Sequence, residues 1–425
     1  MSVLDELPSP NPQRLAVRVA PRALRHIRAG HPWVFDHSIE STSLPGSPGD
    51  LAVVFDSKRN FAGIGLWDPN SPIRIRMLHA GKPRAIDDEF WAERIDATLA
   101  LRSGLIHSAA TTGMRLVHGE NDLMPGFTVD RYDTTLVVKI YSEAWLPHLN
   151  DVLLVLLDRC GRAGLKIDRV VTRASRQVRS VMPDLDGAVV LGDEPSEPVV
   201  FLENGLKFYV DVVRGQKTGH FLDQRDNRLM VRSFAGGRRV LDVFSSTGGF
   251  SVNAAAGGAT SVLSVDLSSS ALYLAKKNMS LNAELSAVAE CDHDIEIGDA
   301  FEELVRLAHG GRRFDLVIVD PPSFAQREAD RPNALRAYRR LADLAMALVA
   351  PRGLYLQSSC SSRITMEELR EAVLDAADAT GRRVEIQSEH GHAVDHPIGF
   401  EQGAYLKTIV VRFEPRAERG DAGRR

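Results

Sequence analysis

The chain has 425 residues, 44% of them hydrophobic and 25% charged, and a formal net charge of −4 at pH 7. This length exceeds one ordinary hydrophobic core and the composition is that of a globular protein, so we expect two or three domains. The small net charge excludes a protein that binds polyanions over its whole surface, and any nucleic-acid site has to be a local basic patch.

The chain ends and the cysteines indicate the compartment. The first residues carry no apolar core of a signal peptide, and no apolar run approaches membrane-spanning length. Cys160, Cys291 and Cys360 are far apart and follow no disulfide spacing, which suits a reducing cytosol. We therefore expect a cytoplasmic protein without a membrane segment, with flexible polar tails at 1–13 and 416–425.

The first predicted domain spans residues 14–84. Strand-like runs alternate with Gly- and Pro-rich turns, a pattern typical of a small β-barrel; the runs are 15–19, 51–55, 61–67 and 73–78. A group of basic residues followed by an aromatic lies near its start, namely Arg18, Arg22, Arg25, Arg28 and Trp33. Such a charge run is more often a solvated helix face, but on a small barrel it also fits RNA contact.

The second predicted domain spans residues 85–194 and mixes helix and strand patterns. The predicted elements are a helix at 87–105, strands at 114–120 and 126–142, an apolar helix at 149–165 and a strand at 168–173. This is an α+β unit. We interpret the polar residues around its turns as structural.

The third predicted domain spans residues 195–415 and alternates strands with helices. The predicted strands are 238–244, 261–266, 315–320 and 353–359, and a helix pattern follows each one. This alternation predicts a doubly wound sheet with helices on both faces. Ligands of such sheets bind beyond the carboxyl ends of the strands, at a switch in strand order. The residues directly after each strand are therefore candidate site residues.

A glycine turn follows the first strand of this domain. The stretch from Asp242 through Phe244 and Ser246 ends in Gly248 and Gly249, which let the backbone approach a ligand closely. A tight packing turn would also explain the glycines, and neither a dinucleotide fingerprint nor a P-loop lysine is present. The next strand ends in Asp266, where a ribose diol is held in folds of this kind. A nucleoside cofactor is therefore expected.

Asp299, in the stretch 295–304, ends a further predicted strand, which lies between those at 261–266 and 315–320. Its carboxylate is placed to accept a hydrogen bond from an adenine amino group. As a lone aspartate before a helical segment, it equally fits the N-cap of that helix.

Two further strand ends carry reactive groups. One strand runs directly into Asp320, followed by two prolines that stiffen the exit loop, and the next ends just before Cys360. Neighbouring strands of this sheet would bring the two residues together. A single cysteine is usually a buried, inert thiol. Cys360, however, precedes a helix opened by the capping-box pattern of Thr365 and Glu368, and a helix N-terminus favours the reactive thiolate.

These residues resemble the class I methyltransferases, and more closely the large-subunit ribosomal RNA 5-methylcytosine methyltransferase I family. The similarity covers about residues 14–412 and rests on motifs in a fixed order, namely 30–39, 49–56, 63–78, 115–132, 214–228, 240–259, 320–324, 358–362 and 395–407. It implies an α/β Rossmann-like class I methyltransferase domain, preceded by a small β-barrel PUA domain and an α+β (ββαββ) middle domain. It also implies S-adenosylmethionine as cofactor and large-subunit ribosomal RNA as partner.

The resemblance also implies residue roles. The residues expected around S-adenosylmethionine are Asp242, Phe244, Ser246, Gly248, Gly249, Asp266 and Asp299, with Lys217 and Gln224 near its amino-acid end. Cys360 is the expected nucleophile toward cytosine C6, and Asp320 the group that hydrogen-bonds or protonates N3. The chain departs from the family pattern at His220, at Ser246 and over residues 395–401.

Other functions and assemblies stay open at this point. Purine-nitrogen methylation of ribosomal RNA is one alternative, although nitrogen needs no covalent thiol. A catalytically silent RNA-binding or ribosome-assembly factor is another, against which the intact set of Asp266, Asp320 and Cys360 counts. The Cys-x-His at 291–293 and the His-x-His at 390–392 match no zinc spacing, so no metal is expected. A homodimer is left open.

Overall fold

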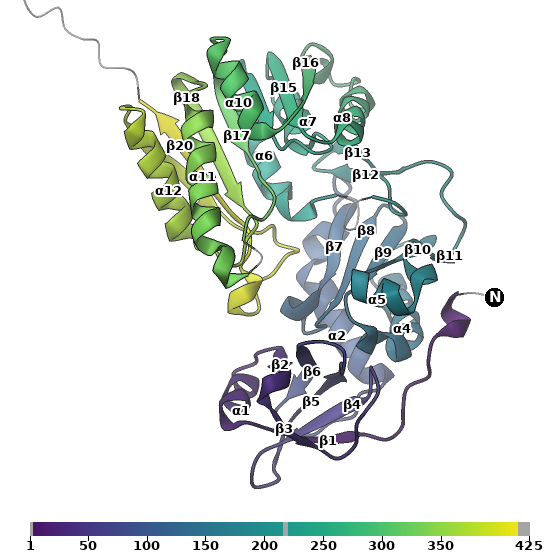
Figure 1. Cartoon of the computed structure of the whole chain (residues 1–425). Coiled ribbons are helices and arrows are strands. Elements are labelled where there is room, and N and C mark those ends of the chain that lie inside the picture. Colours follow the sequence, from purple (N-terminus) through teal and green to yellow (C-terminus); the bar gives the residue numbers. More distant parts are fainter. Residues whose placement is uncertain (1–2, 216–219, 326, 415–425) are drawn as a thin grey trace, which may run out of the picture. The chain divides into compact units, whose positions relative to one another are not determined.

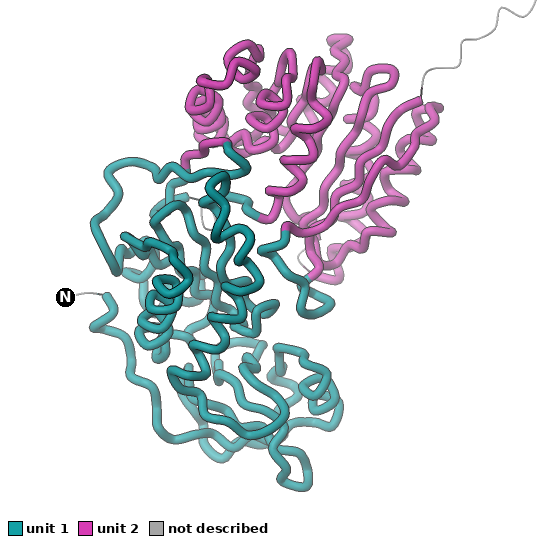
Figure 2. The backbone as a smooth tube through the Cα atoms, turned by 180° about the vertical axis from the view of Figure 1, so that it is seen from behind, with its two compact units in different colours: residues 1–205, 210–222, 394–403 teal, residues 206–209, 223–393, 404–425 magenta. Residues whose placement is uncertain are grey.

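The computed structural model describes residues 3–215, 220–325 and 327–414. The chain divides into two compact units, coloured separately in Figure 2. Unit 1 comprises Met1–Gly205, Val210–Leu222 and Val394–Gly403, and unit 2 comprises Leu206–Tyr209, Asp223–Ala393 and Ala404–Arg425. Unit 1 thus contains both predicted N-terminal domains. It also contains three segments that the sequence assigned to the third domain, so the predicted boundary after residue 194 does not match this division.

The first part of unit 1 is a six-stranded sheet with one helix (Figure 1). Its strands are β1 (Leu15–Val19), β2 (Trp33–Phe35), β3 (Ile39–Thr42), β4 (Leu51–Phe55), β5 (Phe61–Trp67) and β6 (Ile73–Ala80), in the order β2-β6-β5-β4-β1-β3. β1 alternates buried and exposed residues, as a half-buried strand should. Helix α1 (Pro21–Arg28) buries Ala23, Leu24 and Ile27 and exposes its arginines. The predicted basic helix is therefore present.

The second part of unit 1 is a five-stranded sheet with helices. Its strands are β7 (Gly113–His118), β8 (Phe127–Tyr132), β9 (Thr135–Ile140), β10 (Arg169–Ala174) and β11 (Val189–Leu191), in the order β11-β10-β9-β8-β7. Its helices are α2 (Asp88–Leu101), α3 (Ser103–Ile106), α4 (Leu149–Arg162) and α5 (Arg176–Val181).

The second sheet contains one strand more than the ββαββ pattern. The run 126–142, predicted as a single strand, is the antiparallel hairpin of β8 and β9. Asp133 at the connection adopts a left-handed φ of 55°, which an aspartate tolerates and a tight hairpin turn requires. Alternating apolar residues on both sides of this turn made the two strands resemble one.

The N-terminal segment is ordered against this sheet. A short 3₁₀ turn, η1 (Val3–Glu6), is followed by Leu7. Val3, Leu4 and Leu7 pack against the hydrophobic core of the second sheet. The prediction of a flexible tail over 1–13 is therefore wrong for this part, because three apolar side chains in the segment have a core to bury against. The predicted tail at 416–425 lies outside the described residues.

Unit 2 is built on a seven-stranded sheet in the order β16-β15-β14-β17-β18-β20-β19. These strands are β14 (Arg239–Val243), β15 (Ser261–Asp266), β16 (Asp292–Ile297), β17 (Phe314–Val319), β18 (Val349–Ser359), β19 (Val384–His390) and β20 (Lys407–Phe413). The first five are parallel to one another, whereas β20 pairs antiparallel with both β18 and β19. The strand order reverses between β14 and β17, which is the switch point at which such sheets bind ligands.

Helices cover both faces of this sheet, as the sequence predicted. They are α6 (Arg225–Phe234), α7 (Gly249–Ala256), α8 (Ser269–Leu281), α9 (Ser286–Ala289), α10 (Ala300–His309), α11 (Arg331–Met346) and α12 (Met366–Ala379). Alternate strand residues enter separate cores: Leu241 and Val243 pack with α10, α11 and α12, whereas Val240 packs with α6 and α7. Figure 1 shows α10, α11 and α12 on one face.

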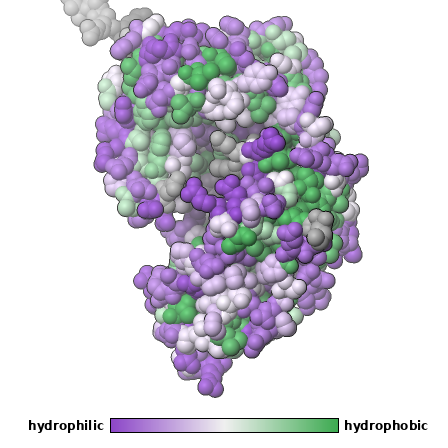
Figure 3. All heavy atoms as spheres, turned by 45° about the vertical axis from the view of Figure 1, so that its right-hand side comes forward, coloured by the Kyte–Doolittle hydropathy of each residue, from purple (hydrophilic) through white to green (hydrophobic). Residues whose placement is uncertain are grey.

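Short elements complete the fold. β12 (Val199–Glu203) and β13 (Leu206–Val210) form a two-stranded sheet. The remaining 3₁₀ turns are η2 (Asp36–Ser38), η3 (Gly119–Asp122), η4 (Glu143–His148), η5 (Pro183–Leu185), η6 (Leu222–Gln224), η7 (Glu328–Asp330) and η8 (Glu401–Gly403). Hydrophilic side chains cover much of the face drawn in Figure 3. Across the described ranges, no helix has the length and apolar character needed to cross a membrane.

Within unit 1, the segment Val394–Gly403 is held by a buried arginine. Arg102 is fully buried and donates to Asp122 Oδ2 at 2.6 Å and to the Asp395 carbonyl at 2.8 Å. The Asp395 carboxylate in turn accepts from Arg115 N at 2.9 Å, and Gly399 N donates to Asn121 at 2.8 Å. Charge-assisted bonds therefore tie residues distant in sequence to the second sheet.

We expect Arg102→Met to destabilise the protein strongly. The change leaves the Asp122 carboxylate buried without its guanidinium partner, which costs about 3–5 kcal/mol in the free energy of unfolding. Urea unfolding followed by circular dichroism measures this loss. Arg162→Met is the matched control, because Arg162 is 65% exposed in its ion pair with Asp158 and should leave the free energy nearly unchanged. Equal midpoints for the two variants would contradict the anchoring role of Arg102.

Candidate active site

The turn after β14 adopts a backbone conformation that most residues avoid. Phe244, Ser246 and Gly248 have φ values of 63°, 50° and 77°. Gly248 is the N-cap of α7, and a Cβ there would lie only 2.7 Å from the Ala275 Cβ of α8. A glycine is therefore required both by conformation and by space. The same turn ends at the carboxyl edge of the sheet, beside the switch point.

Asp266 ties this turn to the end of β15. Its carboxylate accepts from Ser246 N at 2.9 Å and from Ser268 N at 2.8 Å. Each carboxylate oxygen can accept a further hydrogen bond, so the group retains capacity for a ligand hydroxyl. The structure thus brings together Ser246 and Asp266, which the sequence singled out separately.

Asp242 lies beneath the turn and not in its surface. Its side chain is fully buried and accepts from Ser251 Oγ at 2.6 Å. Burial raises the pKa of this carboxyl to about 7, with a smaller contribution from the nearby charge of Asp266. Because the side chain has no exposed surface, it can act on a ligand site only by holding the loop above it in shape. A direct cofactor contact, as expected from the sequence, does not fit this placement.

Asp299 and Phe244 lie at the same edge in different environments. Asp299 is exposed and caps α10, accepting from Phe301 N at 2.9 Å and from Glu302 N at 3.3 Å. This is the N-cap that the sequence left open as one of two interpretations. Phe244 is half-buried against the core beneath α10, α11 and α12. Both side chains keep some surface that a ligand could contact.

Asp320 is held by a chain of amides. Gln224 Nε2 donates to Asp320 Oδ1 at 2.8 Å, and Asn227 Nδ2 donates to Gln224 Oε1 at 2.5 Å and to Thr408 Oγ1 at 3.1 Å. Burial, with smaller contributions from the carboxylates of Asp223 and Asp242, raises the pKa of Asp320 to about 7. At neutral pH the group is thus close to the midpoint between acid and carboxylate.

Cys360 lies beside Asp320, as the predicted neighbouring strands require. β17 and β18 are parallel neighbours, and Cys360 Sγ lies 3.8 Å from the carbonyl oxygen of Pro321. The thiol is half-buried. On its N-terminal side, Ser359 Oγ donates to the hydroxyl of Tyr338 at 2.9 Å, which fixes the end of the strand. A potential acid and a potential nucleophile therefore meet at one edge of the sheet.

The sequence analysis did not single out three residues around this pair. Lys407 lies on β20 and its Nζ donates to the Ser361 carbonyl at 2.6 Å. Tyr405 donates its hydroxyl to Asp223 Oδ2 at 2.9 Å. A lysine at the start of a largely apolar strand is a local signal for Lys407, because lysines are seldom buried unless paired. Tyr405 and Asp223 have no local signal, because their contact joins the segment before β20 to η6, far away in sequence.

The other predicted site residues lie in unit 1 or outside the described residues. Arg18, Arg22 and Arg25 are exposed on β1 and α1, and Arg28 pairs with Asp56 at 3.2 Å. Trp33 is half-buried, and its Nε1 donates to Glu120 at 2.9 Å. Lys217 is among the residues that are not described.

His220 and the histidines of the two short motifs at 291–293 and 390–392 have structural surroundings. His220 is buried, and its ring packs 5.1 Å from that of Phe201. His293 Nε2 lies 2.8 Å from Ser264 Oγ, and His392 Nε2 accepts from Leu406 N at 2.8 Å. No group of three metal-ligating side chains occurs within the part of the chain that the structure describes.

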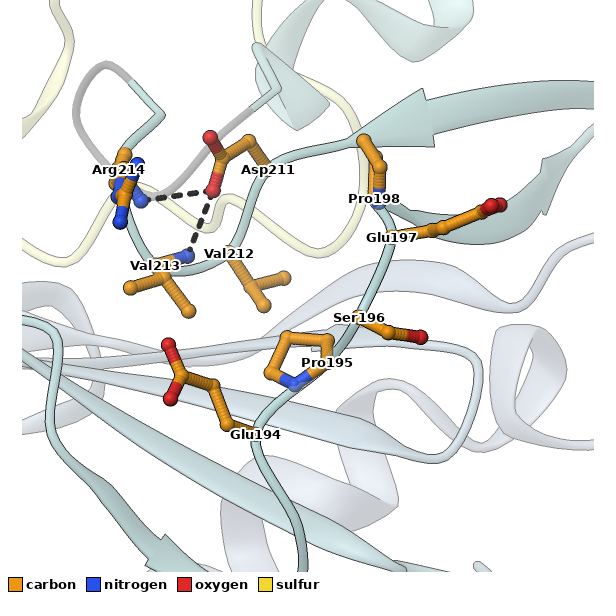
Figure 4. Close-up of a pocket in the computed structure, with 9 residues that line it drawn as sticks. All are labelled: Glu194, Pro195, Ser196, Glu197, Pro198, Asp211, Val212, Val213 and Arg214. Atoms are coloured by element: carbon orange, nitrogen blue, oxygen red, sulfur yellow. Dashed lines mark hydrogen bonds between the residues drawn. The ribbon is translucent and has the colours of Figure 1, made fainter.

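A pocket of about 240 Å³ lies elsewhere, in unit 1 (Figure 4). It is lined by Glu194, Pro195, Ser196, Glu197, Pro198, Asp211, Val212, Val213 and Arg214. Asp211 turns its carboxylate back to accept from Val213 N and Arg214 N, so this group is used in holding its own turn. None of the strand-end residues lines this pocket.

Comparison with known proteins relates this geometry to a family. A model of the S-adenosylmethionine-dependent methyltransferases matches residues 115–390, and a PUA-like domain model matches residues 17–80. A ribosomal RNA large subunit methyltransferase of Deinococcus radiodurans is 44% identical over 96% of this chain and 99% of its own length. A ribosomal RNA large subunit methyltransferase I of Shewanella frigidimarina is 35% identical over 94% and 99%.

Solved structures show the same fold. A SAM-dependent methyltransferase from Streptococcus mutans superposes with a TM-score of 0.78 at 20% identity, over 93% of this chain and 99% of its own. A methyltransferase complexed with SAH (S-adenosylhomocysteine) superposes with a TM-score of 0.79 at 20% identity and the same coverage. The predicted fold class, a PUA-like domain and a Rossmann-like methyltransferase domain, is thus confirmed. The chain is therefore an S-adenosylmethionine-dependent methyltransferase and belongs to the large-subunit ribosomal RNA methyltransferase I family.

Proposed function

We propose that the protein methylates C5 of a cytosine in large-subunit ribosomal RNA, with Cys360 as nucleophile and Asp320 as acid. The observation that carries this proposal is the contact between the Cys360 thiol and the carbonyl of Pro321, the residue that directly follows Asp320. The names of the relatives support the RNA substrate. Nitrogen is nucleophilic without help, so a thiol at this place favours carbon methylation.

The residues at the switch point fit S-adenosylmethionine. Gly248 and Gly249 let the backbone of this turn pack closely against Ala275 and Arg228, and the Asp266 carboxylate beside the turn can accept from the two hydroxyls of a ribose. Phe244 would contact the adenine ring, and Asp299 its amino group. Gln224 and Lys217 would lie near the amino-acid end. When bound, the cofactor supplies a methyl group on a positively charged sulfur.

The protein residues activate a carbon that is otherwise a poor nucleophile. The Cys360 thiolate adds to C6, and the electrons of the C5–C6 double bond move toward N3, which Asp320 protonates. C5 then has enamine character and accepts the methyl group. The C5 proton then passes to a solvent water, the electrons of the C5–H bond restore the C5–C6 double bond, and the bond between C6 and sulfur breaks to return the thiolate. The N3 proton goes back to Asp320.

The hydrogen-bond network orients Asp320 for this task. Gln224 Nε2 occupies Oδ1 as a donor, so the proton of the neutral acid is carried on Oδ2. The raised pKa, near 7, means that the acid form is available at neutral pH. The target base has to leave its stack to reach the strand ends, so it should come from a single-stranded or opened RNA region. The arginines of α1 and β1 and Trp33 would contact the RNA elsewhere.

We expect Cys360→Ala to abolish formation of 5-methylcytidine, because no thiolate can add to C6. The measurement is nucleoside mass spectrometry after incubation with S-adenosylmethionine and unmodified large-subunit ribosomal RNA. Cys291→Ala is the control and should keep full activity. RNA containing 5-fluorocytidine should form a denaturation-resistant complex with wild type and none with Cys360→Ala, because fluorine at C5 blocks the elimination. A methylated purine made equally well by Cys360→Ala would refute the proposal.

The pH profile tests Asp320. Its acid form predominates below pH 7 and is lost above it, so kcat/KM should fall on the alkaline side with an apparent pKa near 7. In Asp320→Asn this fall should disappear, while activity drops by about 10²–10⁴-fold because the amide donates a hydrogen bond but no proton. Asp315→Asn, on the opposite end of β17, is the control. If kcat/KM of Asp320→Asn still fell at alkaline pH, the fall would belong to the titration of another group.

Asp266→Asn should weaken cofactor binding. Removing a charge-assisted hydrogen bond costs about 1.5–3 kcal/mol, so the Kd for S-adenosylmethionine should rise about 10- to 150-fold in isothermal titration calorimetry. Asp299→Ser separates the two roles of Asp299, since serine keeps the N-cap but not the carboxylate. Unchanged affinity with unchanged stability in Asp299→Ser would leave Asp299 with its capping role alone. Unchanged affinity in Asp266→Asn would remove Asp266 from the site.

A further inference from the structure

Lys407 is a buried cation directly across from the nucleophile's strand end. It opens β20 and is paired with Ser359, the last residue of β18, in the antiparallel register. Cys360 is the next residue along β18. The Lys407 side chain is only 7% exposed, and Nζ donates to the Ser361 carbonyl at 2.6 Å. The lysine thus spans the turn that carries Cys360, from one flanking serine to the other.

A buried ammonium needs an anionic partner to balance its desolvation. Burial lowers the pKa of Lys407 to about 8, and the charges that oppose this shift are first Cys360 and then Glu368. Electrostatic coupling is reciprocal: an anion at Cys360 favours the ammonium, and the ammonium favours the anion to the same extent. Among the described residues, Tyr338 of α11 lies close enough to Cys360 for the two groups to interact electrostatically, and its hydroxyl carries no positive charge.

The N-terminus of α12 supplies little of the positive charge that the sequence suggested. Thr365 Oγ1 accepts from Glu368 N at 3.2 Å, and Glu368 Oε2 accepts from Thr365 N at 2.9 Å. The capping box therefore satisfies the helix end and places a carboxylate there. The same carboxylate is paired with Arg331, so this helix end is already occupied by its own partners. Lys407 is a buried cation that contacts the Cys360 turn directly.

We infer that Lys407 is the positioning residue that holds the Cys360 turn and stabilises its thiolate through the buried ammonium. This inference rests on the proposed function of Cys360 as nucleophile. In the resting thiol, the S–H group points to the Pro321 carbonyl. On ionisation the proton passes to solvent, the sulfur keeps the electron pair, and Lys407 stays protonated. No bond of the lysine is made or broken.

The test is the pH dependence of Cys360 alkylation in the full chain. Iodoacetamide reacts with the thiolate, and peptide mass spectrometry reports each cysteine separately. Cys160 and Cys291 are internal references, because burial raises their pKa values to about 12 and about 11. In Lys407→Met, the midpoint for Cys360 should move up by about one pH unit or more, so alkylation at neutral pH slows about tenfold.

Matched variants separate charge from packing. Lys407→Arg keeps the charge and should restore most of the wild-type rate. Lys207→Met removes an exposed lysine that pairs with Glu284 and should leave the profile unchanged. Lys407→Gln replaces Lys407→Met if the latter does not fold, as judged by thermal unfolding. An unchanged Cys360 profile in a folded, uncharged variant would overturn the inference, and so would failure of Lys407→Arg to exceed Lys407→Met.

The two proposals fail separately. If Cys360→Ala still makes 5-methylcytidine, the proposed function is wrong, whatever Lys407 does to the thiol. If Cys360 is essential for methylation but its alkylation does not depend on the charge at 407, the function stands and the inference on Lys407 is wrong. Slower alkylation in Lys407→Met with rescue by Lys407→Arg supports the inference without using methylation as the readout.

Discussion

The parallel pairing of β14, β17 and β18 determines where the glycine turn, Asp320 and Cys360 lie in unit 2. Parallel strands end at one edge of the sheet, and the order reverses between β14 and β17. The turn after β14, Asp320 after β17 and Cys360 after β18 are therefore neighbours without being close in sequence. The alternation of core residues between the two faces keeps these strands in register, because a shift by one residue would exchange the two cores.

Much of this arrangement could be predicted from local sequence patterns. Gly248 marks a turn that needs a positive φ and a close approach of the backbone. Asp266 could be predicted as the residue beside this turn because it is the aspartate at the end of the next strand. The adjacency of Asp320 and Cys360 followed from the strand order alone. Each of these features depends on a strand end and the residues directly after it, which is the information that a single sequence carries best.

Other features depend on pairing between distant segments and left no local pattern. Lys407 faces the Cys360 turn because β20 runs antiparallel beside β18, and its sequence neighbours indicate an ordinary strand. Asp395 belongs to unit 1 through Arg102 and Arg115, although it lies near the end of the third predicted domain. The hairpin of β8 and β9 was predicted as one strand because Asp133 adopts a left-handed conformation, which an aspartate in the sequence does not indicate as a glycine would.

Two buried carboxyl groups at the carboxyl edge of the unit 2 sheet lower the free energy of unfolding at neutral pH. Asp242 and Asp320 both have pKa values raised to about 7, with burial as the main cause. Between their unfolded and folded pKa values the native state binds more protons than the unfolded chain, so both groups make the protein less stable as pH rises from about 4 to about 7. A paired or solvated carboxylate would avoid this loss. An acid that has to give a proton at neutral pH needs the raised pKa, and the same burial that weakens the fold at this edge provides it.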